Sequence, residues 1–275
     1  MINFDGIYEN PIMLTDCYNT SHYFLKEDST YEVSHMYNRA QGMVLYGLHE
    51  KVEKILDTKI KKWMVEEAKF HANKMGLVFP TEMWMKVVNE CNGVMPLKVQ
   101  ILPEGTFIPT GAPFCQIRNT KDGFGELVTW FEPVLMHAYF SSHCATRAVE
   151  IKQYLEEKKD QYGYDDSFMW RVHSFGFRGH RSMEDSHWAG TAWNLALNGT
   201  DDFHTSLYTP SAVIGSISAL AHKVTQQFDD EYQCFVRAID QASTQKNKIV
   251  AMVIDTYNAS NVIENYIVKL ARYAK

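Results

Sequence analysis

Cysteines are few in this chain and follow no metal-binding or disulfide pattern. They are odd in number and none belongs to a C-x-x-C pair; the five are Cys17, Cys91, Cys115, Cys144 and Cys234. A scattered, odd set lacks the paired spacing of a disulfide framework or a zinc site. The sequence therefore favours a reducing compartment.

A surplus of basic residues and long apolar runs are also missing. The formal net charge is −6, which does not provide the basic face that sequence-independent binding of nucleic acid requires. No apolar run reaches membrane-spanning length, and the first ten residues lack the pattern of a signal peptide. We therefore expect a cytoplasmic protein that binds neither nucleic acid nor a membrane.

Apolar residues are plentiful, at 45% of 275 residues, which is enough for a sizeable core. Their spacing predicts helices over residues 44–92 and 124–159, with short strands between them at 97–101, 107–108 and 114–117. We assign residues 1–164 to a mixed α+β N-terminal domain with a small β subdomain near 93–120.

Near the N-terminus, Thr15 and Asp16 are suited to cap a helix that carries Tyr18, His22 and Tyr23. The pattern alone favours an amphipathic helix that packs its aromatic rings. The alternative is that Asp16 and Tyr18 face a ligand.

Beyond residue 165, strands and helices alternate, which is typical of βα units. We predict strands over 168–177 and 249–254, an apolar stretch near 203–208, and helices over 183–197, 212–228 and up to residue 273. Residues 165–275 would thus form part of an α/β barrel. So short a parallel sheet would leave buried edges unpaired, so the N-terminal region or another chain should complete it, or the chain belongs to a larger assembly.

Residues 172–202 collect the groups of a candidate pocket. His173, Phe175 and Arg178 follow one another at the end of a predicted strand, and Asp201 closes an N-G-T-D sequence. A carboxylate, a guanidinium and an aromatic face are what a flat heterocycle with a polar edge needs. Farther on, Asp255 follows an apolar strand, where it would either face a ligand or metal at the barrel's carboxyl end or cap the next helix.

Five segments together carry a family resemblance. They are NPIMLTDCYNTSHY (10–23), LPEGTFIPTGAPF (102–114), HSFGFRG (173–179), NGTDD (198–202) and VIDTYN (253–258). In order and spacing this set resembles the nicotinamide phosphoribosyltransferases. The resemblance extends over nearly all of this chain but over only about the first half of the family's sequence.

The resemblance implies a homodimer with an irregular α/β barrel of the type II phosphoribosyltransferase kind. It implies an enzyme of NAD salvage that makes nicotinamide mononucleotide and pyrophosphate from nicotinamide and phosphoribosyl pyrophosphate, with Mg²⁺. The Mg²⁺ ligands are not identifiable from this sequence.

The same resemblance assigns roles in a nicotinamide pocket. Phe175 would stack on one face of the pyridine ring, and Tyr18 of the opposite subunit on the other. Asp201 would accept a hydrogen bond from the carboxamide NH₂, which favours the amide over the acid because a carboxylate there would meet like charge.

Two residues take catalytic roles by the same analogy. Arg178 would hold the amide oxygen or the nucleotide phosphate, and Asp255 would face the ribose or the metal. Asp16 and His173 would support the substrate-binding residues. Positioning and charge neutralisation would carry most of the work of displacing pyrophosphate from the ribose.

The sequence also departs from the family pattern. Ile214 stands where the family has a histidine that is phosphorylated during ATP hydrolysis, so coupling to ATP by that route should be absent. Tyr208 stands where the family has a small residue beside the ring pocket, and this would narrow the pocket. The family's R-P-D-S-G and G-D-G segments, which bind phosphoribosyl pyrophosphate, do not occur here.

Three hypotheses follow. The first is that the chain is the N-terminal subunit of a split nicotinamide phosphoribosyltransferase that needs a complementary C-terminal chain. The second is a catalytically degenerate homologue that binds a nicotinamide compound or a protein. The third, a shortened transferase with a rebuilt phosphate site, is the least favoured because no Gly-rich loop offers a phosphate cradle.

Overall fold

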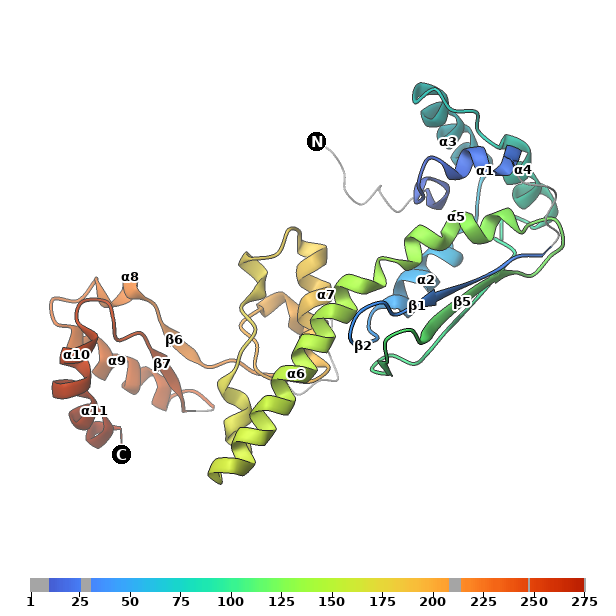
Figure 1. Ribbon diagram of the computed structural model, residues 1–275. Coiled ribbons are helices and arrows are strands. Elements are labelled where there is room, and N and C mark those ends of the chain that lie inside the picture. Colours follow the sequence, from blue (N-terminus) through green and yellow to red (C-terminus); the bar gives the residue numbers. More distant parts are fainter. Residues whose placement is uncertain (1–9, 26–30, 208–213, 247, 275) are drawn as a thin grey trace. The chain divides into compact units, whose positions relative to one another are not determined.

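The computed structural model describes residues 10–25, 31–207, 214–246 and 248–274. The chain forms two compact units, Met1–Ile214 and Gly215–Lys275, which we call unit 1 and unit 2. Figure 1 shows their elements. The boundary predicted at residue 164 remains a prediction about domain organisation, and the described residues 165–207 belong to unit 1.

Unit 1 contains a three-stranded antiparallel sheet in the order β1 (Val33–Tyr37), β5 (Pro113–Asn119) and β3 (Leu97–Ile101). Ile117 of β5 lies opposite Ser34 of β1 and Val99 of β3. A second sheet in unit 1 consists of two short antiparallel strands, β2 (Met43–Val44) and β4 (Phe107–Ile108). The three predicted strands are confirmed, whereas β1 was not predicted.

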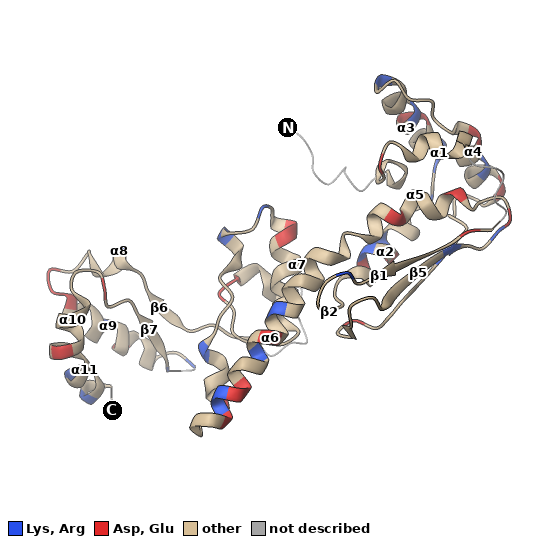
Figure 2. Cartoon of the chain, viewed as in Figure 1, with Lys and Arg blue, Asp and Glu red and all other residues tan. Residues whose placement is uncertain are grey.

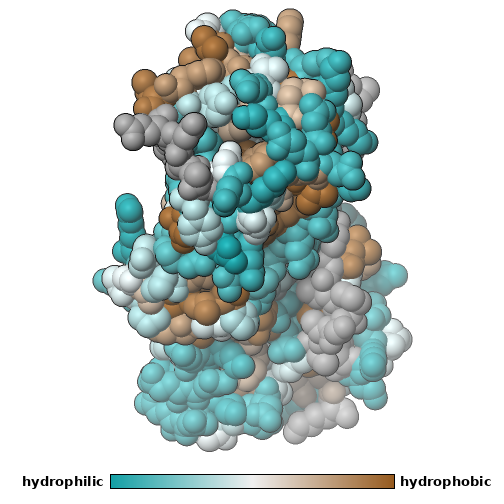
Figure 3. Space-filling model, turned by 90° about the vertical axis from the view of Figure 1, so that its right-hand side faces the viewer, coloured by the Kyte–Doolittle hydropathy of each residue, from teal (hydrophilic) through white to brown (hydrophobic). Residues whose placement is uncertain are grey.

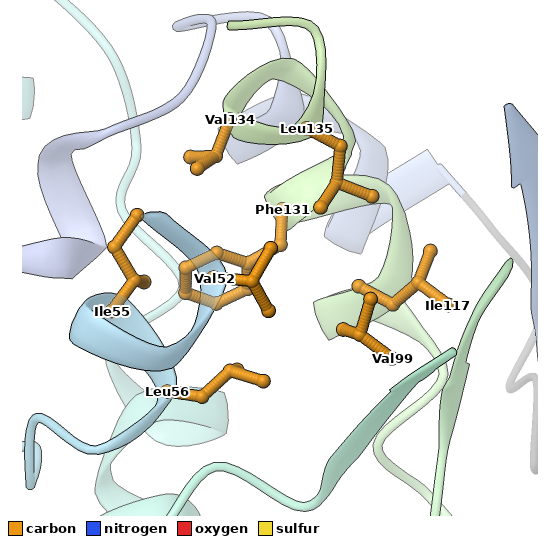
Figure 4. Close-up of a pocket in the computed structure, with 8 residues that line it drawn as sticks. All are labelled: Val52, Ile55, Leu56, Val99, Ile117, Phe131, Val134 and Leu135. Carbon is orange, nitrogen blue, oxygen red and sulfur yellow. The ribbon is translucent and has the colours of Figure 1, made fainter. Parts of the chain in front are cut away.

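Helices cover one face of this sheet. The predicted helical stretch 44–92 holds α2 (Leu48–Leu56), α3 (Lys62–Lys74) and α4 (Thr81–Glu90), and α5 (Glu126–Leu135) follows the sheet. Figure 4 shows side chains of α2, α5 and the sheet pointing toward one another: Val52, Ile55, Leu56, Val99, Ile117, Phe131, Val134 and Leu135. Because every side chain lining this small hollow is apolar, it is part of the core.

The long helix α6 (Ala138–Tyr162) ends at Gly163, whose φ of 68° is left-handed and suits a helix terminus. It packs against α7 (Met183–Asn194), which begins at Ser182 with a side-chain hydrogen bond to the Asp185 amide. Buried alanines such as Ala145 on α6 and Ala192 on α7 let the two helices approach closely. The helix predicted over 183–197 is therefore confirmed in its main part.

The outer part of α6 carries both signs of charge. Figure 2 shows basic and acidic residues next to one another along it. Arg147 lies 2.6 Å from Glu150 and Lys152 lies 3.9 Å from Glu156. On the face drawn in Figure 3, hydrophobic residues reach the surface in separate patches among hydrophilic ones, as is common in proteins.

The strand predicted over residues 168–177 is wrong. A 3₁₀ helix, Asp166–Arg171, begins at Asp165, whose carboxylate accepts the Ser167 amide at 2.9 Å. The aromatic run is not buried, since Trp170 is 38% exposed and Phe168 stacks on Tyr164 with ring centroids 4.8 Å apart. Local capping and aromatic stacking thus replace the sheet pairing that the apolar run suggested.

Unit 2 is built on a parallel pair of strands, β6 (Ser218–Leu220) and β7 (Val250–Met252). Around it lie α8 (His222–Thr225), α9 (Glu231–Ser243), α10 (Ala259–Asn261), a π-helical turn Val262–Tyr266, and α11 (Ile267–Tyr273). Its buried apolar side chains are Leu220, Cys234, Phe235, Val262 and Leu270.

The strand predicted over 249–254 is confirmed in its centre, and the last helix does reach Tyr273. The helix predicted over 212–228 is wrong, because residues 218–220 form a strand and only α8 is helical within the described part. The start of that prediction, 212–213, lies outside the described residues, as does Tyr208. No helix among the described residues is long and apolar enough to cross a membrane.

Candidate functional site

Two stretches of unit 1, residues 172–178 and 199–202, run side by side, and we call them together the paired segment. Ser174 and Thr200 form a single parallel bridge. The Ser174 amide donates to the Gly199 carbonyl at 3.1 Å, and the Asp201 amide donates to the Ser174 carbonyl at 2.9 Å. This pairing brings the H-S-F-G-F-R sequence beside N-G-T-D-D, as a site built from both motifs requires.

Gly199 makes the close pairing sterically feasible. A Cβ atom at this position would lie 2.6 Å from the Val172 carbonyl oxygen and 2.6 Å from Cδ2 of His173. Neither atom can move freely, because the Val172 oxygen belongs to the backbone and the His173 ring is held by hydrogen bonds at both nitrogens. Any larger residue would therefore push the two stretches apart.

His173 and Asp201 form the central contact of the paired segment. Nδ1 of His173 lies 2.8 Å from Oδ2 of Asp201, and Nε2 lies 2.9 Å from the Trp170 carbonyl oxygen. Only 9% of the His173 side chain and 18% of the Asp201 side chain is exposed. Since a carbonyl only accepts, Nε2 must carry a proton.

Both ring nitrogens of His173 have a partner, Oδ2 of Asp201 at Nδ1 and the Trp170 carbonyl oxygen at Nε2. The contact at Nδ1 holds Oδ2 of Asp201 in place. The role of His173 as a support for Asp201 is consistent with this geometry.

Phe175 precedes a short 3₁₀ turn, Gly176–Arg178, which Arg178 ends, and both side chains are exposed. The Phe175 ring is 56% exposed, so one of its faces is available for stacking. Phe177 instead contacts the His204 ring, with centroids 5.0 Å apart. The structure thus places His173, Phe175, Arg178 and Asp201 on one paired segment, with an aromatic plate facing outward.

Tyr18 and Asp16 lie elsewhere in unit 1. Tyr18 precedes α1 (Asn19–Leu25) and is 57% exposed, with its ring 5.1 Å from that of His22. The negative charge of the nearby Asp16 raises the pKa of Tyr18. α1 packs on α5, whereas the paired segment packs with α7. Figure 1 shows α1 and α7 in different parts of unit 1.

Asp255 lies in unit 2, just beyond β7. Its Oδ1 is 3.0 Å from Nε2 of His222, and both side chains are largely exposed. The next helix is capped by Asn258, whose Oδ1 accepts the Asn261 amide at 3.1 Å, so the alternative role of Asp255 as that cap is wrong.

Sequence reasoning missed His222. The available signal was topological, because parallel strands bring their carboxyl ends to the same edge of a sheet. His222 opens α8 directly after β6, and Asp255 follows β7, the strand paired with it.

The described residues hold no group of three or more His, Cys, Asp or Glu side chains able to bind a metal ion. Ile214, at the end of unit 1, is partly buried and offers no acceptor for a phosphoryl group.

Comparison with known proteins identifies the relatives of this chain. A family model described as the N-terminal domain of nicotinamide phosphoribosyltransferase matches residues 10–99. A nicotinamide phosphoribosyltransferase from Xanthomonas campestris pv. campestris is 24% identical over 274 residues, which cover 94% of this chain and 58% of that protein. The chain is similar to the nicotinamide phosphoribosyltransferases. A second such protein, from Acinetobacter baylyi, is 30% identical over 188 residues, covering 65% of this chain and 37% of that protein.

The solved structures agree on the fold. Nicotinate-nucleotide pyrophosphorylase from Pyrococcus furiosus superposes with a TM-score of 0.57 at 17% identity, covering 95% of this chain and 54% of that one. At this identity the likeness concerns the fold alone, and it confirms the predicted α/β class. The chain spans only part of the length of each nicotinamide phosphoribosyltransferase that it matches, 58% of one and 37% of the other.

Proposed function

We propose that this chain is the N-terminal part of a split nicotinamide phosphoribosyltransferase of NAD salvage. The observation that carries the proposal is the paired segment, which sets an exposed aromatic plate beside a carboxylate fixed by His173. Relatives named for this activity match over most of the chain but are much longer than it. In this proposal a second chain supplies the residues that correspond to the rest of those relatives.

In this proposal the paired segment binds nicotinamide. The Phe175 ring covers one face of the pyridine, and Asp201 accepts a hydrogen bond from the carboxamide nitrogen. Arg178 holds the amide oxygen or a phosphate of the nucleotide. Nicotinic acid is disfavoured because its carboxylate would lie against Asp201.

The second ring face requires another copy of the chain. Tyr18 is exposed and precedes α1, which Figure 1 shows away from α7, and in this proposal it serves the pocket of a partner subunit. A two-fold homodimer satisfies this need symmetrically, with each copy giving Tyr18 and receiving one. We place this assembly in the cytoplasm.

The chemistry is a displacement at the anomeric carbon of phosphoribosyl pyrophosphate. The pyridine nitrogen forms the new bond as pyrophosphate leaves, and the ribose passes through a cation-like state. The residues of this chain hold the ring in line and keep water from its faces. By analogy with the family, Asp255, whose Oδ1 lies 3.0 Å from Nε2 of His222, would face the ribose or the metal. Mg²⁺ would neutralise charge on the phosphates of the substrate.

Unit 2 supports the need for a completing chain. Its sheet has two parallel strands among the described residues, so β6 and β7 each have an edge without a described strand partner. Parallel sheets are normally larger and covered on both faces. Strands of a C-terminal chain added at these edges would extend the barrel and bring phosphate-binding segments to the ribose side.

Ile214 favours a second candidate function. Isoleucine replaces the family's phosphorylated histidine, as expected for a degenerate homologue that binds nicotinamide or a protein without catalysis. The two functions differ in one measurable product.

The experiment is to assay nicotinamide mononucleotide formation by the chain alone and together with a chain that carries R-P-D-S-G and G-D-G segments. The split enzyme predicts product only in the mixture. Nicotinamide binding without product in either case would support the degenerate homologue. Absence of both would overturn the split enzyme and the nicotinamide-binding form of the degenerate homologue.

A further inference from the structure

Asp202, the second carboxylate of the N-G-T-D-D sequence, faces away from the position of Asp201. Successive side chains of an extended chain point to opposite sides. Here the Asp201 side chain is 18% exposed, whereas Asp202 is only 2% exposed. Oδ1 of Asp202 accepts the Phe177 amide at 2.9 Å. Oδ2 accepts the Gly176 amide at 3.2 Å and the Ser174 hydroxyl at 2.5 Å.

These donors belong to the turn that carries the candidate stacking plate. The first N–H groups of a helical turn have no partner within it, and a carboxylate is the strongest acceptor a side chain offers them. A buried charge is otherwise costly, and three hydrogen bonds offset that cost. Asp202 therefore holds the beginning of the turn from inside the protein.

The other side of the same turn is bounded by His180. A Cβ atom at Gly176 would lie 2.3 Å from Cε1 of that ring, so a side chain at this position would collide with His180. With the backbone of the turn held in this way, the exposed side chains of Phe175, Phe177 and Arg178 are the groups that can meet a ligand, and Phe177 also contacts the His204 ring.

We propose that Asp202 is the positioning residue that sets Phe175 and Arg178 for base binding, separate from Asp201, which reads the carboxamide. The identity of the base rests on the proposed function, whereas the hold on the turn rests on the contacts of Asp202 alone. Without the Asp202 carboxylate the turn is no longer held, so the Phe175 ring and the Arg178 guanidinium lose their fixed positions. Asp202 discriminates nothing by itself, and its loss weakens nicotinamide and nicotinic acid alike.

The first test is spectroscopic and needs no ligand. In ¹H–¹⁵N spectra of the full chain, the Gly176 and Phe177 amide protons should be shifted downfield by their bonds to the carboxylate. In Asp202→Asn, one side-chain oxygen becomes an NH₂ group, so the Gly176 shift is lost and the Phe177 shift persists more weakly. In Asp202→Ala both shifts are lost. Ser174→Ala leaves the bonds of both amides to the Asp202 carboxylate in place but removes the 3.5 Å contact of the Gly176 amide with the Ser174 hydroxyl. It should therefore retain the Phe177 shift and most of the Gly176 shift.

The second test measures binding by calorimetry with nicotinamide and with nicotinic acid. Loss of one hydrogen bond to a charged group should weaken the binding of each compound about tenfold in Asp202→Asn. The ratio of the two affinities should stay at the wild-type value. Asp122→Asn, an exposed carboxylate of unit 1, is the matched control and should change neither affinity nor shifts.

The outcomes separate the two proposals. Unchanged Gly176 and Phe177 shifts in Asp202→Asn and Asp202→Ala would overturn the positioning role, as would a changed affinity ratio with unchanged affinity for nicotinamide. If the wild-type chain binds neither compound, the proposed function fails, and the amide shifts still decide whether Asp202 holds the turn. Should Asp202→Ala lose its folded spectrum, Ser174→Ala and Asp202→Asn provide the graded comparison.

Discussion

The core of unit 1 and the paired segment are held together by different interactions. In the core, aliphatic side chains pack around aromatic rings that meet edge to face, as where Trp84 meets Trp130 with centroids 5.3 Å apart and an interplanar angle of 77°. In the paired segment, His173, Asp201 and Asp202 make hydrogen bonds that fix an exposed turn.

The difference shows where rigidity comes from in each region. Apolar burial is non-directional, so the core tolerates small shifts but loses much free energy when volume is removed. Hydrogen bonds are directional and contribute less net stability, but they decide where an exposed side chain points. Substitutions in the two regions should therefore separate stability from binding.

The largest effect on stability is expected in the core. Phe131→Ala, at a residue 2% exposed beside the hollow of Figure 4, should lower the free energy of unfolding by about 3–5 kcal/mol. Chemical denaturation followed by circular dichroism measures this. Phe70→Ala, at a residue 65% exposed, is the control and should change stability by less than about 0.5 kcal/mol. Equal losses in both variants would contradict the position of the core.

Gly199→Ala should affect both quantities. Its Cβ would collide with the Val172 carbonyl and the His173 ring, so we expect a stability loss of about 1–3 kcal/mol from overpacking. Nicotinamide binding should be lost as well, because the paired segment separates. At Gly179 the nearest atom to an added Cβ is 3.6 Å away, an ordinary contact. Gly179→Ala is therefore the matched control for calorimetry and thermal melting.

Asp201→Asn should change selectivity more than stability. Removing the negative charge relieves repulsion of nicotinic acid, so the preference for the amide should fall about tenfold. Competition binding of the two compounds measures the ratio, with Asp122→Asn as the control of equal charge change. An unaltered ratio would rule out the assigned role of Asp201.

The smallest expected effect is a difference in alkylation rate between two cysteines of the unaltered chain. Burial raises the pKa of Cys115 to about 12, so this thiol stays protonated at pH 7–9 and should resist alkylation in the folded chain. Cys17 is exposed and should react first. Peptide mass spectrometry after brief iodoacetamide treatment compares the two, and reaction of Cys115 before Cys17 would contradict its buried place.

Periodicity predicted the core well. The alternation in residues 97–101 and 114–117 and the helical spacing over 44–92 place Val52, Val99 and Ile117 where the structure has them, because apolar burial repeats with the period of each element. β1 was missed because its central residues, such as His35 and Met36, do not alternate clearly, and its pairing with β5 is a long-range contact.

The candidate site was predicted less completely. The motifs predict Phe175, Arg178 and Asp201 as site residues. The apolar and aromatic run at 168–177 predicts a strand, which the structure does not have. In the structure, residues 166–171 instead form a 3₁₀ helix capped by Asp165, and only Ser174 pairs with a neighbouring stretch, through a single bridge. Asp202 escaped notice because its role depends on the backbone N–H groups of a turn, which leave no period in the sequence.

The placing of Tyr18 before α1 and of the Phe175 turn against α7 has a consequence for mixed dimers. In a two-fold pair whose pockets each borrow a tyrosine, Tyr18→Ala and Phe175→Ala damage different halves of the same pocket. Mixing the two defective proteins should yield mixed pairs in about half of the assemblies, each with one pocket fully intact and the other doubly impaired. Two inactive preparations would then regain binding on re-association, by subunit complementation.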